Sequence, residues 1–172
     1  MINDIKELVR RGYITRDDSV KKLSQKYLQK ARNNLITMSL LSDINNNKKA
    51  RDLLKIPSDY NTDEWVVICG YYAMYASALA LIAKIGYKSK NHTATIKLLK
   101  EFFIKRKLMP KEDVDLLKNA IIQKVEIEKL SEARHKREIA QYSVTKQTTK
   151  EIAESIKQDA YNFINKTETI IQ

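Results

Sequence analysis

Apolar residues recur at intervals of three and four along most of this chain, a spacing that places them on one face of a helix. Residues 2–11 carry such a stripe, and Gly12 is expected to end this first helix. Residues 17–19 offer side chains that cap a helix N-terminus, and a long amphipathic helix follows them as far as the asparagine run at residues 45–47. A shorter helix is expected around residues 49–54.

The central segment differs, because no residue from Trp65 to Ala83 is charged. Asn61 or Thr62 is expected to cap this helix, and Gly86 suits its C-terminal end. A helix that is hydrophobic on all sides is buried in a protein core or in a membrane. The segment is long enough for a bilayer, but its tyrosine and serine hydroxyls would find no partners in lipid. We therefore predict that this segment is a core helix with protein on every side and that it does not insert into a membrane. Its tyrosine hydroxyls are then expected to find hydrogen-bond partners inside the bundle.

Three further helices are predicted after a basic loop that follows the central segment. They cover Thr93–Ile104, a long stretch from Glu112 to about Tyr142, and about Thr145 to Ile171. No strand pattern stands out. Short loops between long helices indicate antiparallel neighbours, so the fold class predicted is all-α, an up-and-down bundle of about five to six helices. Residues 1–172 are expected to form one domain, in which residues 1–16 are a short N-terminal helical extension.

Composition supports this fold class and narrows the function classes. A chain of 172 residues with 43% hydrophobic residues suits one domain, and three Gly and two Pro are too few for a turn-rich β-protein. The single Cys69 excludes an intramolecular disulfide and a multi-cysteine zinc site. The N-terminus carries charges and no apolar signal segment. We expect a cytoplasmic protein without a metal or cofactor.

Positive charge is concentrated in one part of the chain. The net charge is +11, and residues 84–111 hold nine Lys and Arg side chains against one Glu. A clustered excess of this kind suggests a polyanionic partner, such as a nucleic acid or a nucleotide phosphate. A solvated face of a lysine-rich protein is the alternative reading of the same pattern.

Candidate chemistry gathers near the end of the long helix that begins at Glu112. Arg134 and Arg137 are three residues apart and therefore neighbours on that helix, and paired guanidinium groups suit bidentate binding of phosphate. Tyr142 adds a hydroxyl at the end of the run. Salt bridges from the arginines to Glu132, Glu138 or an adjacent helix are the alternative. No glycine-rich phosphate loop and no nucleophile elbow are visible.

Three segments, in the same order along the chain, resemble the HEPN-domain proteins. They are the run Tyr-Tyr-Ala-Met followed by small and aliphatic residues in 70–82, the Gly…Lys-x-His loop in 86–96, and the Arg-x-x-Ala-x-Tyr run in 137–142. The similarity is to a small archaeal and bacterial group often encoded beside a minimal nucleotidyltransferase. It implies a helical bundle that dimerises through the helices carrying the arginine motif.

The resemblance leaves the question of enzymatic activity open. In nuclease members of the family, an Arg followed by four to six residues and a His cleaves RNA. Counting from Arg134, those positions hold Ile139, Ala140 and Gln141. Counting from Arg137, they hold Tyr142, Ser143 and Val144. Proton transfer near neutral pH usually needs a histidine, and none of these positions supplies one.

Two functions are therefore expected as alternatives. The first is a non-catalytic homodimeric partner of a nucleotidyltransferase that binds RNA or nucleotide, with Tyr142 as a candidate acceptor of a nucleotidyl group. Its binding residues would be Arg134, Arg137, Lys88, Lys90 and His92. The second is an RNase toxin of a toxin–antitoxin pair, with a displaced catalytic set drawn from Arg134, Arg137, Tyr142 and either His135 or His92. A plain structural dimer without a ligand is a third possibility.

Overall fold

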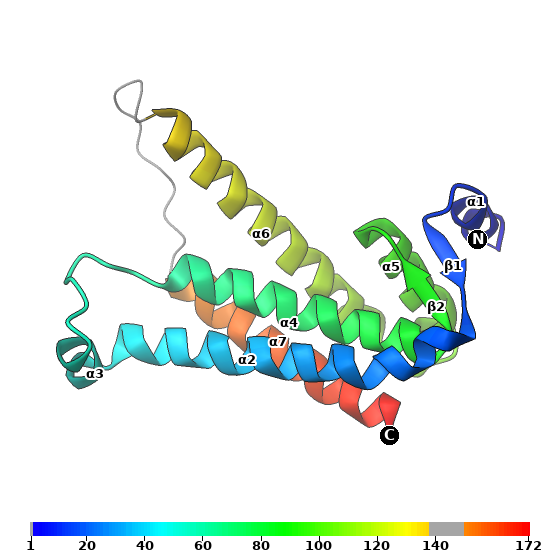
Figure 1. Cartoon of the computed structure of the whole chain (residues 1–172), viewed down its shortest axis with the longest axis horizontal. Coiled ribbons are helices and arrows are strands. Elements are labelled where there is room, and N and C mark those ends of the chain that lie inside the picture. Colours follow the sequence, from blue (N-terminus) through cyan, green and yellow to red (C-terminus); the bar gives the residue numbers. More distant parts are fainter. Residues whose placement is uncertain (1, 138–149) are drawn as a thin grey trace.

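The structure is a computed structural model that describes the backbone of residues 2–137 and 150–172, and the side chains of residues 5–128 and 150–172. Three long helices lie side by side: α2 (Ser24–Asn46), α4 (Asp63–Lys84) and α7 (Lys150–Ile171) (Figure 1). A fourth, α6 (Lys111–Arg137), starts against this group and diverges from it toward its C-terminal end (Figure 1). The all-helical fold predicted from the sequence is thus confirmed.

Three short helices bring the described part of the chain to seven α-helices, where the sequence suggested five or six. They are α1 (Ile2–Arg10), α3 (Lys48–Leu53) and α5 (His92–Leu99). The predicted helix over residues 93–104 ends in a different form, because a π-helical turn at Lys100–Ile104 follows α5. The predicted continuation of α6 to Tyr142 and the start of the last helix at Thr145 lie outside the described residues.

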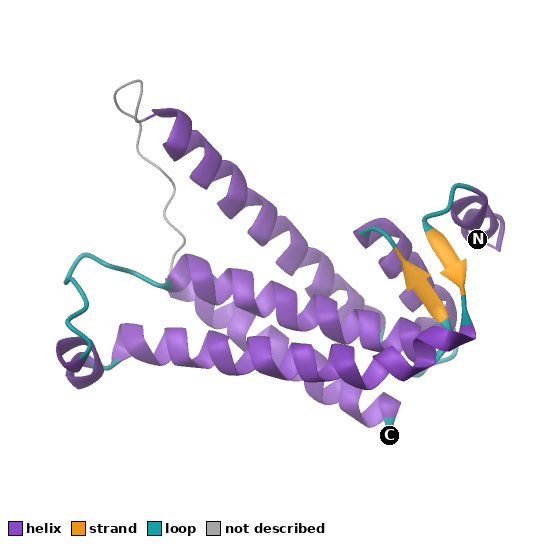
Figure 2. Ribbon diagram, viewed as in Figure 1, coloured by secondary structure: helices purple, strands orange, loops and turns teal. Residues whose placement is uncertain are grey.

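Two short strands are present, although no strand pattern stood out in the sequence. Strands β1 (Ile14–Arg16) and β2 (Tyr87–Ser89) form a small antiparallel sheet, in which Ile14 lies opposite Ser89 (Figure 2). Each strand has only three residues, which is too short for an alternating pattern to show in the sequence. The sheet joins the N-terminal extension to the loop after α4, so the extension is not entirely helical.

Asp17, which follows β1, and Gly86, which precedes β2, fix the backbone at the same end of the small sheet. Asp17 accepts a hydrogen bond from the backbone N–H of Ser19 at 2.9 Å and starts a 3-10 helix (Asp18–Leu23) that leads into α2. Just before β2, Gly86 has a φ of +79°, and a Cβ placed there would lie 2.6 Å from the Asp18 carboxylate. The positive φ therefore favours glycine at this position, and a larger side chain would also have to displace the exposed Asp18 carboxylate.

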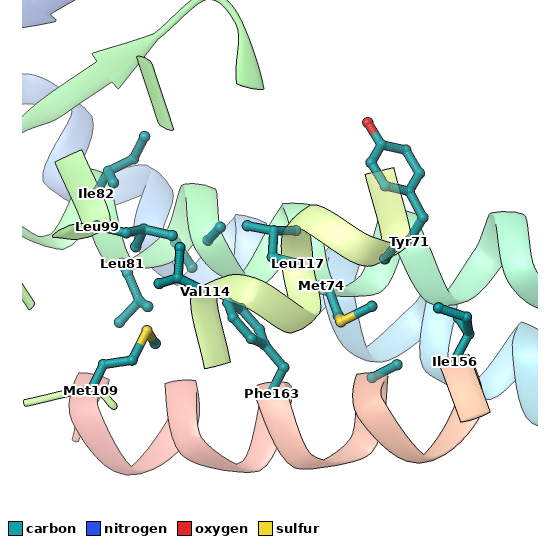
Figure 3. Packing of buried hydrophobic residues seen from close by; sticks show 14 of the residues in the cluster. Tyr71, Met74, Leu81, Ile82, Leu99, Met109, Val114, Leu117, Ile156 and Phe163 are labelled. Atoms are coloured by element: carbon teal, nitrogen blue, oxygen red, sulfur yellow. The ribbon is translucent and has the colours of Figure 1, made fainter. Parts of the chain in front are cut away.

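Helix α4 is the centre of the hydrophobic core, as the sequence predicted. Its length and composition would allow it to cross a membrane, but 72% of its most apolar window is buried inside the protein. Met74 and Leu81 of α4 pack with Phe163 of α7 and Leu117 of α6 (Figure 3). At Gly70 the approach of α7 is so close that a Cβ would lie 2.6 Å from Ile156 Cγ2.

One stripe of α4 departs from the expectation that protein surrounds the helix. Trp65 is 53% exposed and Tyr72 is 41% exposed, although most of their neighbours on the helix are buried. The two residues are seven apart and therefore lie on the same face. They occupy the N-terminal part of α4, where α6 diverges from it (Figure 1).

Candidate functional site

A cluster of tyrosines and one histidine lies where α4 meets the N-terminus of α5. The Tyr71 hydroxyl of α4 is 2.7 Å from Nε2 of His92, the first residue of α5, and either group can donate the hydrogen bond. The ring of Tyr75, one turn later on α4, stacks on that of Tyr71 with centroids 5.8 Å apart and planes 13° from parallel. His92 packs against Tyr75 as well, at a centroid distance of 4.7 Å.

A chain of hydroxyl groups extends this cluster to the small sheet. The Tyr75 hydroxyl lies 3.4 Å from Oγ1 of Thr95, which is 2.6 Å from Oγ of Ser89 in β2. Asn91 fixes the start of α5, because its side chain accepts a hydrogen bond from the Ala94 backbone N–H at 2.8 Å. The loop after α4 is therefore ordered by contacts on both of its sides.

Lys124 of α6 supplies the positive charge at this cluster. Its ammonium group lies 5.5 Å from the ring centre of Tyr71 and 5.9 Å from that of Tyr72, within the range of a cation–π interaction. The ammonium also forms an ion pair with Glu128, one turn further along α6. The Lys124 side chain is 16% exposed, so the charge is largely screened from solvent by the aromatic rings and by its carboxylate partner.

These surroundings keep the hydrogen-bonded pair of Tyr71 and His92 uncharged. Burial, with a smaller contribution from the Lys124 charge, lowers the pKa of His92 below its ordinary value of 6.5. Burial also raises the pKa of Tyr71 above its ordinary value, and the neighbouring Tyr75 adds to this effect. Near neutral pH both groups exchange hydrogen bonds as neutral partners, and Tyr71 is a poor nucleophile.

The basic loop predicted to bind phosphate contains residues in three different situations. Lys88 is exposed, and its ammonium lies 3.1 Å from an Asp17 carboxylate oxygen. The hydrogen bond from Ser19 and the neighbouring Lys88 lower the pKa of Asp17 to about 2. Lys90 is exposed, and the described residues offer it no ion pair. His92, by contrast, is half-buried in the tyrosine cluster.

Other charges of the basic segment also have partners within the protein. Lys84 donates a hydrogen bond of 2.8 Å to the carbonyl oxygen of Ile171 at the end of α7, and Lys105 pairs with Glu101 at 2.5 Å. Part of the positive excess in residues 84–111 is therefore used to hold the bundle together.

The predicted arginines lie on the same helix as Lys124, at its far end. Arg134 and Arg137 belong to the last described turns of α6, while Tyr142 lies outside the described residues. At a rise of 1.5 Å per residue, Arg134 is about 15 Å beyond Lys124 along the helix axis. The structure thus brings His92 to Lys124 and not to the arginine end of α6.

Sequence reasoning missed two important members of the cluster, Tyr71 and Lys124. The tyrosine had a usable signal, because a hydroxyl in an uncharged core helix needs a hydrogen-bond partner. The lysine had none, because its position at the cluster depends on the angle at which α6 crosses α4.

Long helices packed around a buried central helix, with a polar cluster beside its middle turns, define this protein as an all-helical bundle domain. The model of the HEPN domain family matches residues 24–170, and the chain belongs to that family. Membership supports a general function connected with nucleotides or RNA. The match begins at the first residue of α2, so α1 and β1 lie outside it. A comparison with curated proteins finds no match.

Proposed function

We propose that this HEPN-domain protein binds RNA or a nucleotide without cleaving it, and that it acts as a homodimeric partner of a minimal nucleotidyltransferase. The observation that carries the first part is the position of His92. This histidine is hydrogen-bonded to Tyr71, and its pKa lies below the ordinary value of 6.5. Its partner Tyr71 carries the Lys124 ammonium over its ring, and Lys124 is about 15 Å along α6 from Arg134. His92 is therefore badly placed to replace the histidine that the arginine motif lacks.

Arginine and lysine side chains are the proposed contacts to phosphate. Arg134 and Arg137 would bind in bidentate fashion, and the exposed Lys90 would add a point charge. Several separate basic groups suit a polynucleotide better than a small anion such as inorganic phosphate. Binding through these groups should weaken strongly with salt, because each neutralised phosphate releases counterions.

The exposed stripe of α4 supports the proposal of a homodimer. Trp65 and Tyr72 are large and exposed, and Ile122 of α6 is 54% exposed. Tryptophan and tyrosine are enriched in protein–protein interfaces, where they bury a large apolar area. A second copy of this chain is the proposed partner for this stripe, and the nucleotidyltransferase would modify Tyr142.

Fluorescence anisotropy with labelled single-stranded RNA, measured over a salt series, tests the binding proposal. We expect salt-sensitive binding, and the Arg134→Ala/Arg137→Ala double variant should reduce the slope of log K against log salt by about 1.4, or about 0.7 for each lost contact. Lys26→Ala, at an exposed position of α2, is the matched control and should change the slope little. Arginine-dependent cleavage of the same RNA would overturn the proposal and favour the RNase toxin.

Two further measurements test the partner proposals. Light scattering after size exclusion should show a dimer for the native chain and a monomer for Trp65→Asp/Tyr72→Asp. Mass spectrometry after incubation with an active nucleotidyltransferase and ATP should show a nucleotidyl group on Tyr142. An unmodified Tyr142 peptide in a reaction that labels another substrate would contradict its role as the acceptor.

A further inference from the structure

A cavity of about 200 Å³ lies between the 3-10 helix, the C-terminal half of α4 and the two-stranded sheet. Its walls are largely apolar and include Val20, Leu79 and Ile82. Tyr27 of α2 and Tyr87 of β2 also line it. The cavity is separate from the arginine end of α6, and of the residues predicted from the sequence to bind phosphate it includes only Lys88 and Lys90.

The volume of the cavity sets the size of a ligand that would fit. An apolar cavity of about 150 Å³ in another protein is known to hold benzene. A space of about 200 Å³ therefore suits a ring system somewhat larger than benzene, of the size of a nucleobase. A ligand with a larger body would have to leave part of itself outside.

The chemistry of the lining adds a second requirement. Two tyrosine side chains line the cavity, and bases stack favourably on aromatic rings. Lys88 and Lys90 belong to the same lining on the β2 side, and both are exposed. Lys90 forms no ion pair with a carboxylate of the described residues, whereas Lys88 forms an ion pair with Asp17. A ligand with a flat ring and an anionic group would satisfy both parts of this lining.

We propose that the cavity binds the base of a mononucleotide, or of the terminal nucleotide of an RNA, with its phosphate held by Lys88 and Lys90. This inference rests on the proposed function for the class of ligand; it adds a place for the base, and it shares Lys90 with that function as a phosphate contact. Ser89 also lines the cavity, and its hydroxyl is hydrogen-bonded to that of Thr95. The Thr95 hydroxyl in turn lies within hydrogen-bond distance of the Tyr75 hydroxyl. A bound nucleotide would therefore touch the hydroxyl chain that leads to the tyrosine–histidine cluster.

Calorimetric titration of the full chain with AMP tests this proposal. Ala83 lines the cavity and is 2% exposed, so Ala83→Leu fills the space where the base would lie. We expect this variant to lose at least about tenfold in AMP affinity, and Lys90→Glu to lose about tenfold. Lys107→Glu changes the same charge at an exposed position that does not line the cavity, and it should stay within about twofold of the native chain.

Several outcomes would overturn the inference. Saturation of the native chain by octanoate and not by AMP would identify an aliphatic anion as the ligand. An equal loss for Lys90→Glu and Lys107→Glu would indicate diffuse charge attraction, and an absence of saturable AMP binding up to about 5 mM would refute the site. Circular dichroism checks the fold of Ala83→Leu, and Lys90→Glu, at an exposed position, stays decisive if that variant does not fold. RNA binding that depends on the arginines but is unchanged by Ala83→Leu would keep the proposed function and reject only this site.

Discussion

Replacing Tyr71 with phenylalanine removes one hydroxyl from the tyrosine–histidine cluster and leaves the buried ring in place. The hydroxyl makes a hydrogen bond of 2.7 Å to His92, while the ring keeps its stacking on Tyr75. A hydrogen bond of this kind contributes about 0.5–1.5 kcal/mol net to stability. For a chain of this size, a loss of 1 kcal/mol lowers the melting temperature by about 2–4 °C. We therefore expect Tyr71→Phe to melt a few degrees below the native protein.

The assay is thermal and urea unfolding followed by circular dichroism at 222 nm, at a pH of about 8, where His92 is neutral in both the folded and the unfolded state. Tyr72→Phe is the matched control, because Tyr72 is 41% exposed and lies next to Tyr71 on α4. It should change the free energy of unfolding by less than about 0.5 kcal/mol. If the two variants have the same stability, the bond between Tyr71 and His92 contributes nothing, and our reasoning about the cluster is wrong.

Three other predictions follow from the loop between α4 and α5. In a His135→Gln background, NMR titration should show that the pKa of His92 lies below 6.5 and that it rises in Lys124→Gln. A lowered pKa in the folded state means that the unfolded chain binds protons more readily, so the free energy of unfolding should fall as the pH drops through about 6.5. A free energy of unfolding that does not change with pH in this range would contradict the prediction. Gly86→Ala should lower the free energy of unfolding by about 1 kcal/mol in urea titrations, because φ is positive there. Asn91→Ala should cost about 0.5–2 kcal/mol through loss of the α5 cap, whereas Asn91→Asp, which can still accept the bond, should cost less.

The helices were predictable because their signals are local. The apolar stripes and the caps lie within a few residues of the boundaries they set, and the predicted start of the central helix after Thr62 agrees with the structure. The strand pair was missed for the opposite reason. Ile14 and Ser89 are distant in the sequence, and nothing within either three-residue segment reveals that it has a partner.

The candidate site was predictable only in part, because it depends on how the helices are placed relative to one another. The loop with Lys88, Lys90 and His92 could be found from its charge and from the family resemblance. The packing of α5 and the sheet turns His92 toward Tyr71 and Lys88 toward Asp17. The exposure of Tyr72 follows in the same way from the divergence of α6, which no residue of α4 encodes.

Strand β1 lies outside the residues that the HEPN model matches. The matched residues include the loop with its histidine, but the strand that pairs with this loop comes from residues 14–16, before the match begins. The N-terminal segment thus acts as a brace for a loop that lies within the matched residues. Substitutions in such a brace can adjust the orientation of the loop while the helical bundle keeps its sequence. A change in the orientation of the loop would in turn move Lys90 and His92, which follow β2.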